Sequence, residues 1–330
     1  MRLRPGIRPR ILLIRFSSIG DIVLTTPVIR SLREAHPDWE LHMLVKPGME
    51  AALGANPRLD RIHRWRGAET LRELKRLDFS HILDLQHNLR SLRVRLALGA
   101  PASVFPKYNL EKYLLVRFKR SLRPIPHVVF RYAETLRPLG AALDAGGLEF
   151  FVPPEAEAEA DAQFRAWGLD RQGPVLAVVL GATYRTKRWP PAHFAELIRL
   201  RGGPVLLLGG PDARADADAI LAQAPAADGV GQFSLAVSAA LMRRCSAVLT
   251  HDTGMMHIAA AFGMQIYSLW GSTVPAFGMT PFRTGHAVLE NQGLGCRPCS
   301  KLGHDACPLG HFRCMEDLRP QDVLLRMRES

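Results

Sequence analysis

The chain has 330 residues, 47% of them hydrophobic, which is enough for two domains with full cores and excludes a disordered chain. No apolar stretch approaches the ~20 residues that a membrane-spanning helix needs, which excludes an ordinary transmembrane segment. The formal net charge of +12 is uneven: residues 1–140 carry 26 Lys and Arg against 12 Asp and Glu, whereas the remainder carries 17 against 19, so we expect only the first half to meet a polyanion.

The basic N-terminal stretch MRLRPGIRPR is followed by a short apolar run that Arg15 and Asp21 interrupt. This pattern does not resemble a secretory signal. We therefore expect a reducing compartment, in which the five cysteines form no disulfides.

The first half alternates strand-like and helix-like segments. Ile11–Phe16 is an apolar run typical of a strand buried on both faces of a parallel sheet. A helix follows as far as Glu34, opened either by Asp21 with a kink at Pro27 or by Thr26 with Pro27 in the first turn. Further elements are expected at Leu41–Val45, Met49–Ala55, Arg61–Trp65, Glu69–Leu77 and Ile82–Leu85. This βαβ rhythm predicts a parallel sheet.

The turn after the first strand has the composition of a binding site. Ser17, Ser18 and Gly20 are small enough to let a ligand approach the backbone. Asp21 comes next, at the carboxyl edge of the sheet, where open α/β folds place their ligand crevice. A carboxylate there can accept a proton from a bound hydroxyl. The alternative is that Asp21 only caps the following helix.

Residues 151–160 (FVPPEAEAEA) interrupt the alternation of strands and helices, because the two prolines at 153 and 154 cannot continue regular structure. We therefore predict an N-terminal domain of residues 1–152 and a C-terminal domain of residues 153–330. The rhythm then restarts, and several strands end in glycine or hydroxyl residues, which suits a diphosphate. Neither GxGxxG nor GxxxxGK[ST] occurs. The expected elements are Val175–Leu180, His193–Leu200, Val205–Leu208, Leu235–Arg244, Ala247–Thr250, Met255–Phe262 and Ile266–Leu269.

Two loops of the second half carry candidate phosphate ligands. Lys187 lies in a hydroxyl-rich loop and suits a departing diphosphate, although a surface lysine is the alternative. Asp252 precedes backbone amides that can bind phosphate oxygens, or it only holds its loop through Asx-type hydrogen bonds. His257, among apolar neighbours, also fits a core position.

Five segments together resemble glycosyltransferase family 9, the bacterial heptosyltransferases. They are RFSSIGDIVLTTPVIRSL, DLQHNLRS, GATYRTKRWP, LLLGGP and THDTGMMHIAAAFG, and their order and spacing span nearly the whole chain. The resemblance implies an α/β GT-B fold, with two Rossmann-like domains whose parallel sheets face each other across a cleft. It also implies inverting transfer of heptose from ADP-heptose to the inner core of lipopolysaccharide, with no cofactor or metal required.

The resemblance also assigns residues. Asp21 matches the family's base, and Lys187 matches its contact to the donor phosphates. Because the two residues lie in different halves of the chain, a cleft between the halves would place them on opposite walls. Tyr184 stands where the family has a smaller hydroxyl residue. The donor site would comprise Ser17, Ser18, Gly20, Thr183, Tyr184, Phe233, Asp252, Thr253, Gly254 and His257.

The acceptor implied is a lipid-anchored anionic glycan (Kdo- or heptosyl-bearing lipid A), which accounts for the basic first half. Its predicted contacts are Lys46, Arg90, Arg93, Lys107 and Lys112. Residues 107–123 interleave Lys and Arg with apolar side chains, typical of a helix at a membrane surface or of an amphipathic helix packed on its own domain. We expect a cytoplasmic monomer, peripheral on the inner membrane, with no nucleic-acid partner.

Four of the five cysteines, Cys296, Cys299, Cys307 and Cys314, lie close together near His304 and His311. Thiolates at close spacing suit zinc or a cluster, but only the first pair has a standard spacing, so reduced structural thiols are the alternative. Cys245 is expected in the core.

Two other functions are compatible with these motifs. One is a GT-B enzyme, transferase or epimerase, acting on a different sugar nucleotide. The other is a non-catalytic polyanion-binding module, which Lys187 and the Asp252 loop argue against because such a module needs neither.

Overall fold

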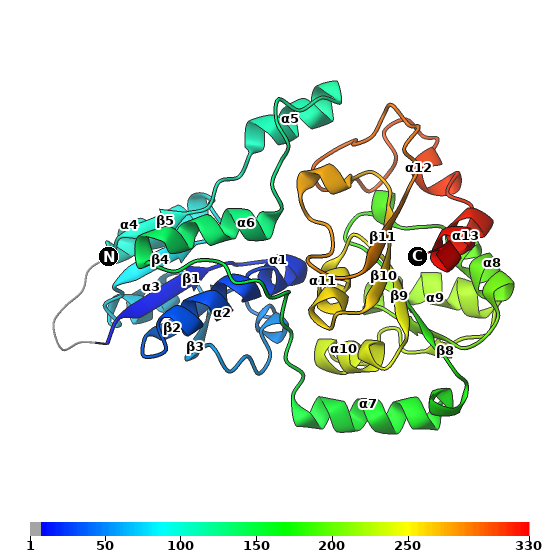
Figure 1. Ribbon diagram of the computed structural model, residues 1–330, viewed down its shortest axis with the longest axis horizontal. Helices are drawn as coiled ribbons and strands as arrows, with labels where there is room; N and C mark the ends of the chain where they lie inside the picture. Colours follow the sequence, from blue (N-terminus) through cyan, green and yellow to red (C-terminus); the bar gives the residue numbers. More distant parts are fainter. Residues whose placement is uncertain (1–7, 330) are drawn as a thin grey trace. The chain divides into compact units, whose positions relative to one another are not determined.

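The structure, a computed structural model, describes residues 8–329 and consists of two units, each built on one parallel sheet (Figure 1). The first unit contains the described residues up to Lys107 and Pro126–Phe151, and the second contains Tyr108–Ile125 and the described residues from Val152 onward. Most of the basic N-terminal stretch lies outside the described residues.

The units differ from the predicted domains of residues 1–152 and 153–330 at Val152 and over residues 108–125, which both belong with the second unit. Two lysines form hydrogen bonds between this segment and the rest of the second unit. Lys119 Nζ donates to the carbonyl oxygen of Pro298 at 2.7 Å, and Lys301 Nζ donates to that of Asn109 at 3.5 Å. The composition change at residues 151–160 gave no sign of these long-range contacts.

The first unit has five strands in the order β3-β2-β1-β4-β5, all parallel. The Ile11–Ile14 side chains are fully buried, as their unbroken apolar run predicts. Two helices pack together on each face, α2 with α6 and α3 with α4. The elements are β1 (Arg10–Ile14), α1 (Ile19–Val23), α2 (Thr26–Ala35), β2 (Glu40–Val45), η1 (Glu50–Ala52), β3 (Arg61–Arg64), α3 (Ala68–Lys75), β4 (His81–Asp84), α4 (Leu89–Leu98), β5 (Ala102–Val104), α6 (Val128–Ala133) and η2 (Glu134–Leu139).

The single helix expected before Glu34 is two helices, α1 and α2. Asp21 lies in the first turn of α1, and Pro27 lies in the first turn of α2, whose N-cap is Thr25. Both alternatives were therefore partly wrong. Pro27 does not kink a continuous helix, because its missing N–H makes it a helix start instead.

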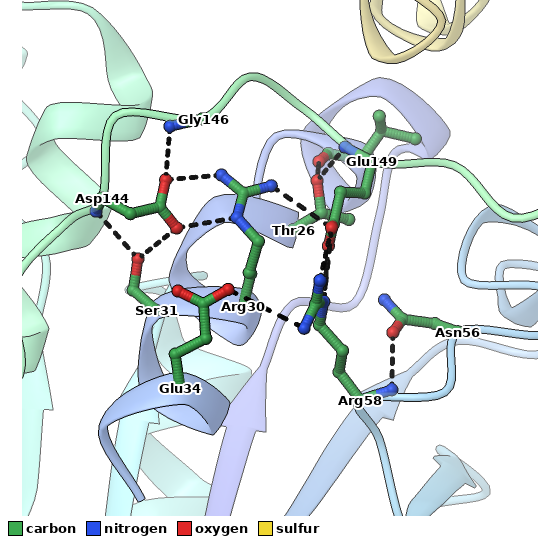
Figure 2. A network of polar contacts seen from close by, with 10 residues as sticks. Thr26, Arg30, Ser31, Glu34, Asn56, Arg58, Asp144, Gly146 and Glu149 are labelled. Atoms are coloured by element: carbon green, nitrogen blue, oxygen red, sulfur yellow. Dashed lines mark hydrogen bonds and ion pairs between the residues drawn. The ribbon is translucent and has the colours of Figure 1, made fainter. Parts of the chain in front are cut away.

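A polar network fastens residues 141–151 to α2 (Figure 2). Arg30 donates through Nε and Nη2 to both carboxylate oxygens of Asp144, at 2.7 and 2.6 Å, and Ser31 Oγ donates to the same carboxylate at 3.1 Å. The hydrogen bonds from Arg30 lower the pKa of Asp144 to about 2. Figure 2 shows Glu149 extending the network to Arg58, which binds both oxygens of that carboxylate.

The second unit has six parallel strands in the order β11-β10-β9-β6-β7-β8. Helix α8 packs on α9 and α13, and α10 packs on α7 and α11. The elements are α5 (Asn109–Phe118), α7 (Pro154–Ala166), η3 (Leu169–Arg171), β6 (Leu176–Val179), η4 (Arg185–Lys187), α8 (Pro191–Arg201), β7 (Val205–Leu208), η5 (Pro211–Ala213), α9 (Arg214–Leu221), β8 (Ala227–Asp228), α10 (Leu235–Arg243), β9 (Ala247–His251), α11 (Gly254–Ala261), β10 (Gln265–Trp270), η6 (Pro275–Phe277), β11 (His286–Glu290), α12 (Arg313–Glu316) and α13 (Pro320–Glu329).

In each sheet the strand order reverses at one point, between β1 and β4 in the first unit and between β6 and β9 in the second. Open α/β sheets bind ligands outside the carboxyl ends of the strands at such a reversal. The loops that begin there hold Asp21, Lys187 and Asp252. No helix among residues 8–329 combines the length and hydropathy of a membrane span.

Candidate functional site

The carboxylate of Asp21 is held at the start of α1. Its Oδ2 accepts hydrogen bonds from the backbone N–H and the hydroxyl of Ser18, at 3.1 and 2.9 Å. The helix-capping contact considered from the sequence is therefore present. The side chain nevertheless keeps 22% of its surface exposed, so the cap and access from solvent coexist.

Arg15 fixes the other oxygen of this carboxylate. Its Nη2 lies 2.6 Å from Asp21 Oδ1, and its Nε and Nη1 donate to the carbonyl oxygens of Ser17 and Leu85 at 3.0 and 2.7 Å. Burial raises the pKa of Asp21, but the Arg15 charge and the hydrogen bonds from Ser18 and Arg15 outweigh burial and lower it. Asp21 is thus ionised at neutral pH. Sequence reasoning did not identify Arg15, although it directly precedes the SSIGD turn.

The predicted donor residues of this turn have different surroundings. Ser18 is exposed, Ser17 is half-buried and Gly20 is buried inside α1. Only Ser18 has a polar side chain engaged with Asp21.

The DLQHNLRS segment is organised by a buried aspartate. Asp84 accepts hydrogen bonds from the backbone N–H groups of Gln86 and His87 and from the Ser91 hydroxyl, at 3.1, 2.7 and 2.8 Å, and pairs with Arg95. Because Asp84 is fully buried, its role is to shape the loop that leads into α4.

Two predicted acceptor contacts lie at the same sheet edge as Asp21. Arg90 is exposed with its guanidinium 5.3 Å from the ring of Phe16, and Lys46 is exposed directly after β2, where its N–H donates to the Phe16 carbonyl. Arg93 is exposed one helical turn after Arg90.

The other two predicted acceptor contacts lie on other segments of the chain. Lys107 is half-buried at the end of a segment of the first unit. Lys112 lies on α5 and therefore belongs to the second unit, not to the basic first domain in which it was expected.

In the second unit, Lys187 and Asp252 meet across two loops. Lys187 Nζ lies 2.6 Å from Asp252 Oδ2, and Thr273 Oγ1 donates to the same oxygen at 3.0 Å. The lysine and aspartate side chains are 15% and 13% exposed, respectively, so the pair is shielded without being closed off. The lysine is not an ordinary surface charge. Sequence reasoning missed Thr273, which follows the strand β10 that it correctly expected.

Hydrogen bonds from residues 272 and 304, outside the loop, hold the loop that carries Lys187 in place. The buried Thr186 exchanges hydrogen bonds with the backbone of His304 and accepts one from the Ser272 N–H at its carbonyl. Tyr184 packs closely against Gly303. A Cβ atom added at Gly303 would lie 2.7 Å from the Cβ atom of Tyr184. Thr183, by contrast, is exposed.

His251 joins the same loop to β9. Its Nε2 accepts the N–H of Trp189 at 2.8 Å, and its Nδ1 lies 3.2 Å from the carbonyl oxygen of Gly181. Burial lowers the pKa of His251 to about 4, so the ring is neutral and donates from Nδ1. Sequence reasoning did not single out His251, although it adjoins Asp252.

The remaining predicted donor residues lie around α10 and α11. Thr253 is the N-cap of α11 and Gly254 its first residue, so backbone N–H groups of the first turn face the loop of Asp252. His257 is 2% exposed within α11, a core position. Phe233 is half-buried before α10 and meets the ring of Trp167 edge-on at 5.9 Å.

Arg297 supports the loop that contains Thr273. This buried guanidinium donates to the carbonyl oxygens of Trp270, Gly271 and Thr273 and pairs with Glu290 at 2.8 Å. No motif of the sequence pointed to it.

The five cysteines are free thiols. Cys245 is buried, as predicted, and Cys296 Sγ lies 3.9 Å from His311 Nε2. Burial raises the pKa of Cys314 to about 12. Across residues 8–329, no three His, Cys, Asp or Glu side chains are arranged to hold a metal ion, so the four candidate ligands Cys296, Cys299, Cys307 and Cys314 do not form such a group.

Comparison with known proteins finds relatives along nearly the whole chain. The model of glycosyltransferase family 9 (heptosyltransferase) matches residues 68–308. Lipopolysaccharide heptosyltransferase 1 of Pseudomonas aeruginosa is 28% identical over 348 aligned positions, which cover 96% of this chain and 93% of that protein.

Solved structures agree in fold. A glycosyltransferase of family 9 from Veillonella parvula gives a TM-score of 0.79 at 21% identity, covering 97% of this chain and 96% of its own. The Escherichia coli ADP-heptose lipopolysaccharide heptosyltransferase II gives 0.73 at 21% identity, covering 97% and 98%. The likeness confirms the predicted GT-B class, with two Rossmann-like units.

Proposed function

The chain belongs to glycosyltransferase family 9, the heptosyltransferases, and on this premise we propose that it transfers a heptose from ADP-heptose to the inner core of lipopolysaccharide with inversion at the anomeric carbon. One observation carries the proposal. Each unit places one group that this reaction needs at its strand-order reversal, a carboxylate in the first and an ammonium in the second. Its relatives are named as lipopolysaccharide heptosyltransferases, which supports the choice of sugar and acceptor.

Asp21 is the general base of the proposed reaction. A hydroxyl oxygen of the acceptor attacks the anomeric carbon and passes its proton to the Asp21 carboxylate. The bond from the anomeric carbon to the phosphate oxygen breaks, and its electron pair leaves with ADP. Because the pKa of Asp21 is lowered, the proton transfers only as the new bond forms and the hydroxyl becomes acidic.

Lys187 stabilises the departing ADP. A shielded ammonium opposes the charge that develops on the diphosphate, and Asp252 with Thr273 holds it in place. The N–H groups at the start of α11 offer further phosphate ligands. We therefore propose that Thr253 and Gly254 bind the donor, that no metal cofactor is required, and that Phe233 contacts the adenine.

The acceptor we propose is a lipid-anchored glycan that carries carboxylates and phosphates. Arg90, Arg93 and Lys46 are exposed cations on the first unit and suit these groups. Such an acceptor would keep the protein at the cytoplasmic surface of the inner membrane. We also propose that the protein is a monomer.

The deciding experiment combines donor binding and transfer. We expect ADP-heptose, but not UDP- or GDP-sugars, to raise the melting temperature of the full chain, and heptose to appear on inner-core acceptor with inverted configuration by NMR. Selective stabilisation by another sugar nucleotide would favour a different GT-B enzyme. Binding of polyanions with no response to any sugar nucleotide would favour a binding module.

A further inference from the structure

Helix α5 exposes three large apolar side chains and buries an acidic one. Leu110, Tyr113 and Phe118 are 59%, 54% and 59% exposed, and Leu122, just after the helix, is 75% exposed. Glu111 is the buried residue of this helix, and Leu114, Leu115 and Val116 are half-buried. At about 100° per residue, Leu110, Tyr113 and Phe118 lie within an arc of about 140° that also contains Arg117. We call this exposed arc the apolar side of α5.

Polar contacts within the second unit hold α5 in place. Glu111 Oε1 accepts from Arg123 Nε at 2.8 Å, and the Arg123 guanidinium lies 4.8 Å from the centre of the Tyr108 ring. Lys119 and Lys301 tie the two ends of the helix to carbonyl oxygens of the second unit, as described above. The exposed side chains of α5 therefore sit on a helix that is attached to the rest of the second unit at both ends.

The charge around this apolar side is strongly positive. Residues 107–123 contain six Lys and Arg and a single Glu. Arg117 and Arg120 are exposed, and no ion pair is found for either of them in the described part of the chain. Arg117 instead lies against the ring of Phe118, 5.8 Å from its centre.

We propose that α5 and Leu122 form an interfacial helix that inserts its apolar side into the surface of a bilayer containing anionic lipid. Leucine and aromatic side chains enter the boundary between headgroups and acyl chains, while flanking arginines and lysines bind lipid phosphates. Because the segment is strongly positive, its charge is complementary to that of an anionic membrane, and we take such a membrane as its partner. The inference rests on the proposed function, whose acceptor is lipid-anchored, and identifies the element that brings the enzyme to it.

The test compares two matched double variants of the full chain. Leu110→Glu with Leu122→Glu changes the proposed insertion surface, and Leu200→Glu with Leu325→Glu makes the same charge change on leucines that are 45% and 56% exposed elsewhere in the second unit. Binding is measured by flotation with phosphatidylcholine vesicles, with and without phosphatidylglycerol. We expect the first double variant to lose at least about tenfold in affinity for anionic vesicles and the control pair to bind like the parent.

The electrostatic part has its own measurement. We expect Arg117→Gln with Arg120→Gln to weaken vesicle binding by about fivefold per residue, and raised salt to weaken the parent in the same way. Equal binding to neutral and anionic vesicles, or equal loss in both leucine double variants, would overturn the proposal. So would concentration-dependent dimerisation of the parent that only Leu110→Glu with Leu122→Glu abolishes, because the surface would then bind a second copy.

Failure of this inference is distinguishable from failure of the proposed function. We expect Leu110→Glu with Leu122→Glu to transfer heptose to a deacylated acceptor in solution at the parental rate, with an unchanged melting temperature. Vesicle binding without transfer by the parent would contradict the proposed function and leave the docking surface standing.

Discussion

The Arg15 guanidinium lies 2.6 Å from the Asp21 carboxylate, while its other nitrogens donate to the carbonyl oxygens of Ser17 and Leu85, in the loops after β1 and β4. One buried side chain therefore sets both the position and the protonation of the proposed base. A variant of Arg15 tests the protonation, and a variant of Asp21 tests the chemistry.

Asp21→Asn keeps an oxygen that can accept from Ser18 but removes the proton acceptor. We expect the transfer rate to fall by about 10²–10⁴-fold while ADP binding, measured by calorimetry, is unchanged. Asp38→Asn, at an exposed carboxylate of the same unit, should retain parental activity. Near-parental turnover of Asp21→Asn would show that Asp21 is not the base.

Replacing Arg15 by methionine removes the charge that lowers the pKa of Asp21. The pKa of Asp21 should therefore rise, and the acidic limb of the kcat/KM profile should move to higher pH. Arg15→Lys keeps the charge and should shift the limb less. A profile of unchanged position in Arg15→Met would mean that Asp21 does not set that limb.

Lys187→Met removes the cation opposite the diphosphate and leaves Asp252 without its partner. We expect transfer to fall by about a hundredfold and ADP affinity to fall with it. Lys75→Met, an exposed lysine on α3, serves as the control. Adding Asp252→Asn should restore part of the melting temperature lost in Lys187→Met but not its activity. A parental rate in Lys187→Met would remove Lys187 from the site.

Asp144 links acid pH to the stability of the first unit. Its pKa is about 2 in the folded protein against 3.8 for an ordinary aspartate, so its stabilisation is present above about pH 4 and is lost as the pH falls toward 2. Denaturant unfolding should therefore show Asp144→Asn less stable by about 2 kcal/mol at pH 7, with the difference disappearing near pH 2. If the difference in unfolding free energy between the parent and Asp144→Asn did not change with pH, the charge of the Asp144 carboxylate would not be what stabilises the fold.

His251 should make the Lys187 loop acid-sensitive. Its pKa is lowered to about 4 from an ordinary 6.5, so the stabilisation by the neutral ring is lost as the pH falls from about 6.5 to about 4. His63 and His81 have pKa values near 4 as well, so only the difference between parent and His251→Gln isolates this ring. We expect His251→Gln to bind ADP more weakly at pH 7 and to flatten the acid dependence of ADP binding.

The periodic elements could be predicted from the sequence because buried parallel strands are nearly pure apolar runs: Val205–Leu208 was located to the residue. The strand ends that hold Asp21, Lys187 and Asp252 followed from the same logic. Thr273, Arg297 and the contacts of Thr186 could not be predicted, because each depends on carbonyl or hydroxyl groups that come close only after folding. Local composition, likewise, could not assign residues 108–125 to the second unit.

The irregular stretch from residue 291 to residue 312 has no helix or strand, yet it contacts both helix α5 and the loop of Ser272. Its Pro298 carbonyl receives Lys119 at the foot of α5, and the next residue, Cys299, donates its N–H to Ser272 beside the nucleotide loops. Adjacent peptide groups therefore hold both the helix that we propose for membrane binding and a loop that we propose for donor binding. If both proposals hold, a bulky group attached to the Cys299 thiol would disturb both attachments and weaken membrane binding and donor binding together.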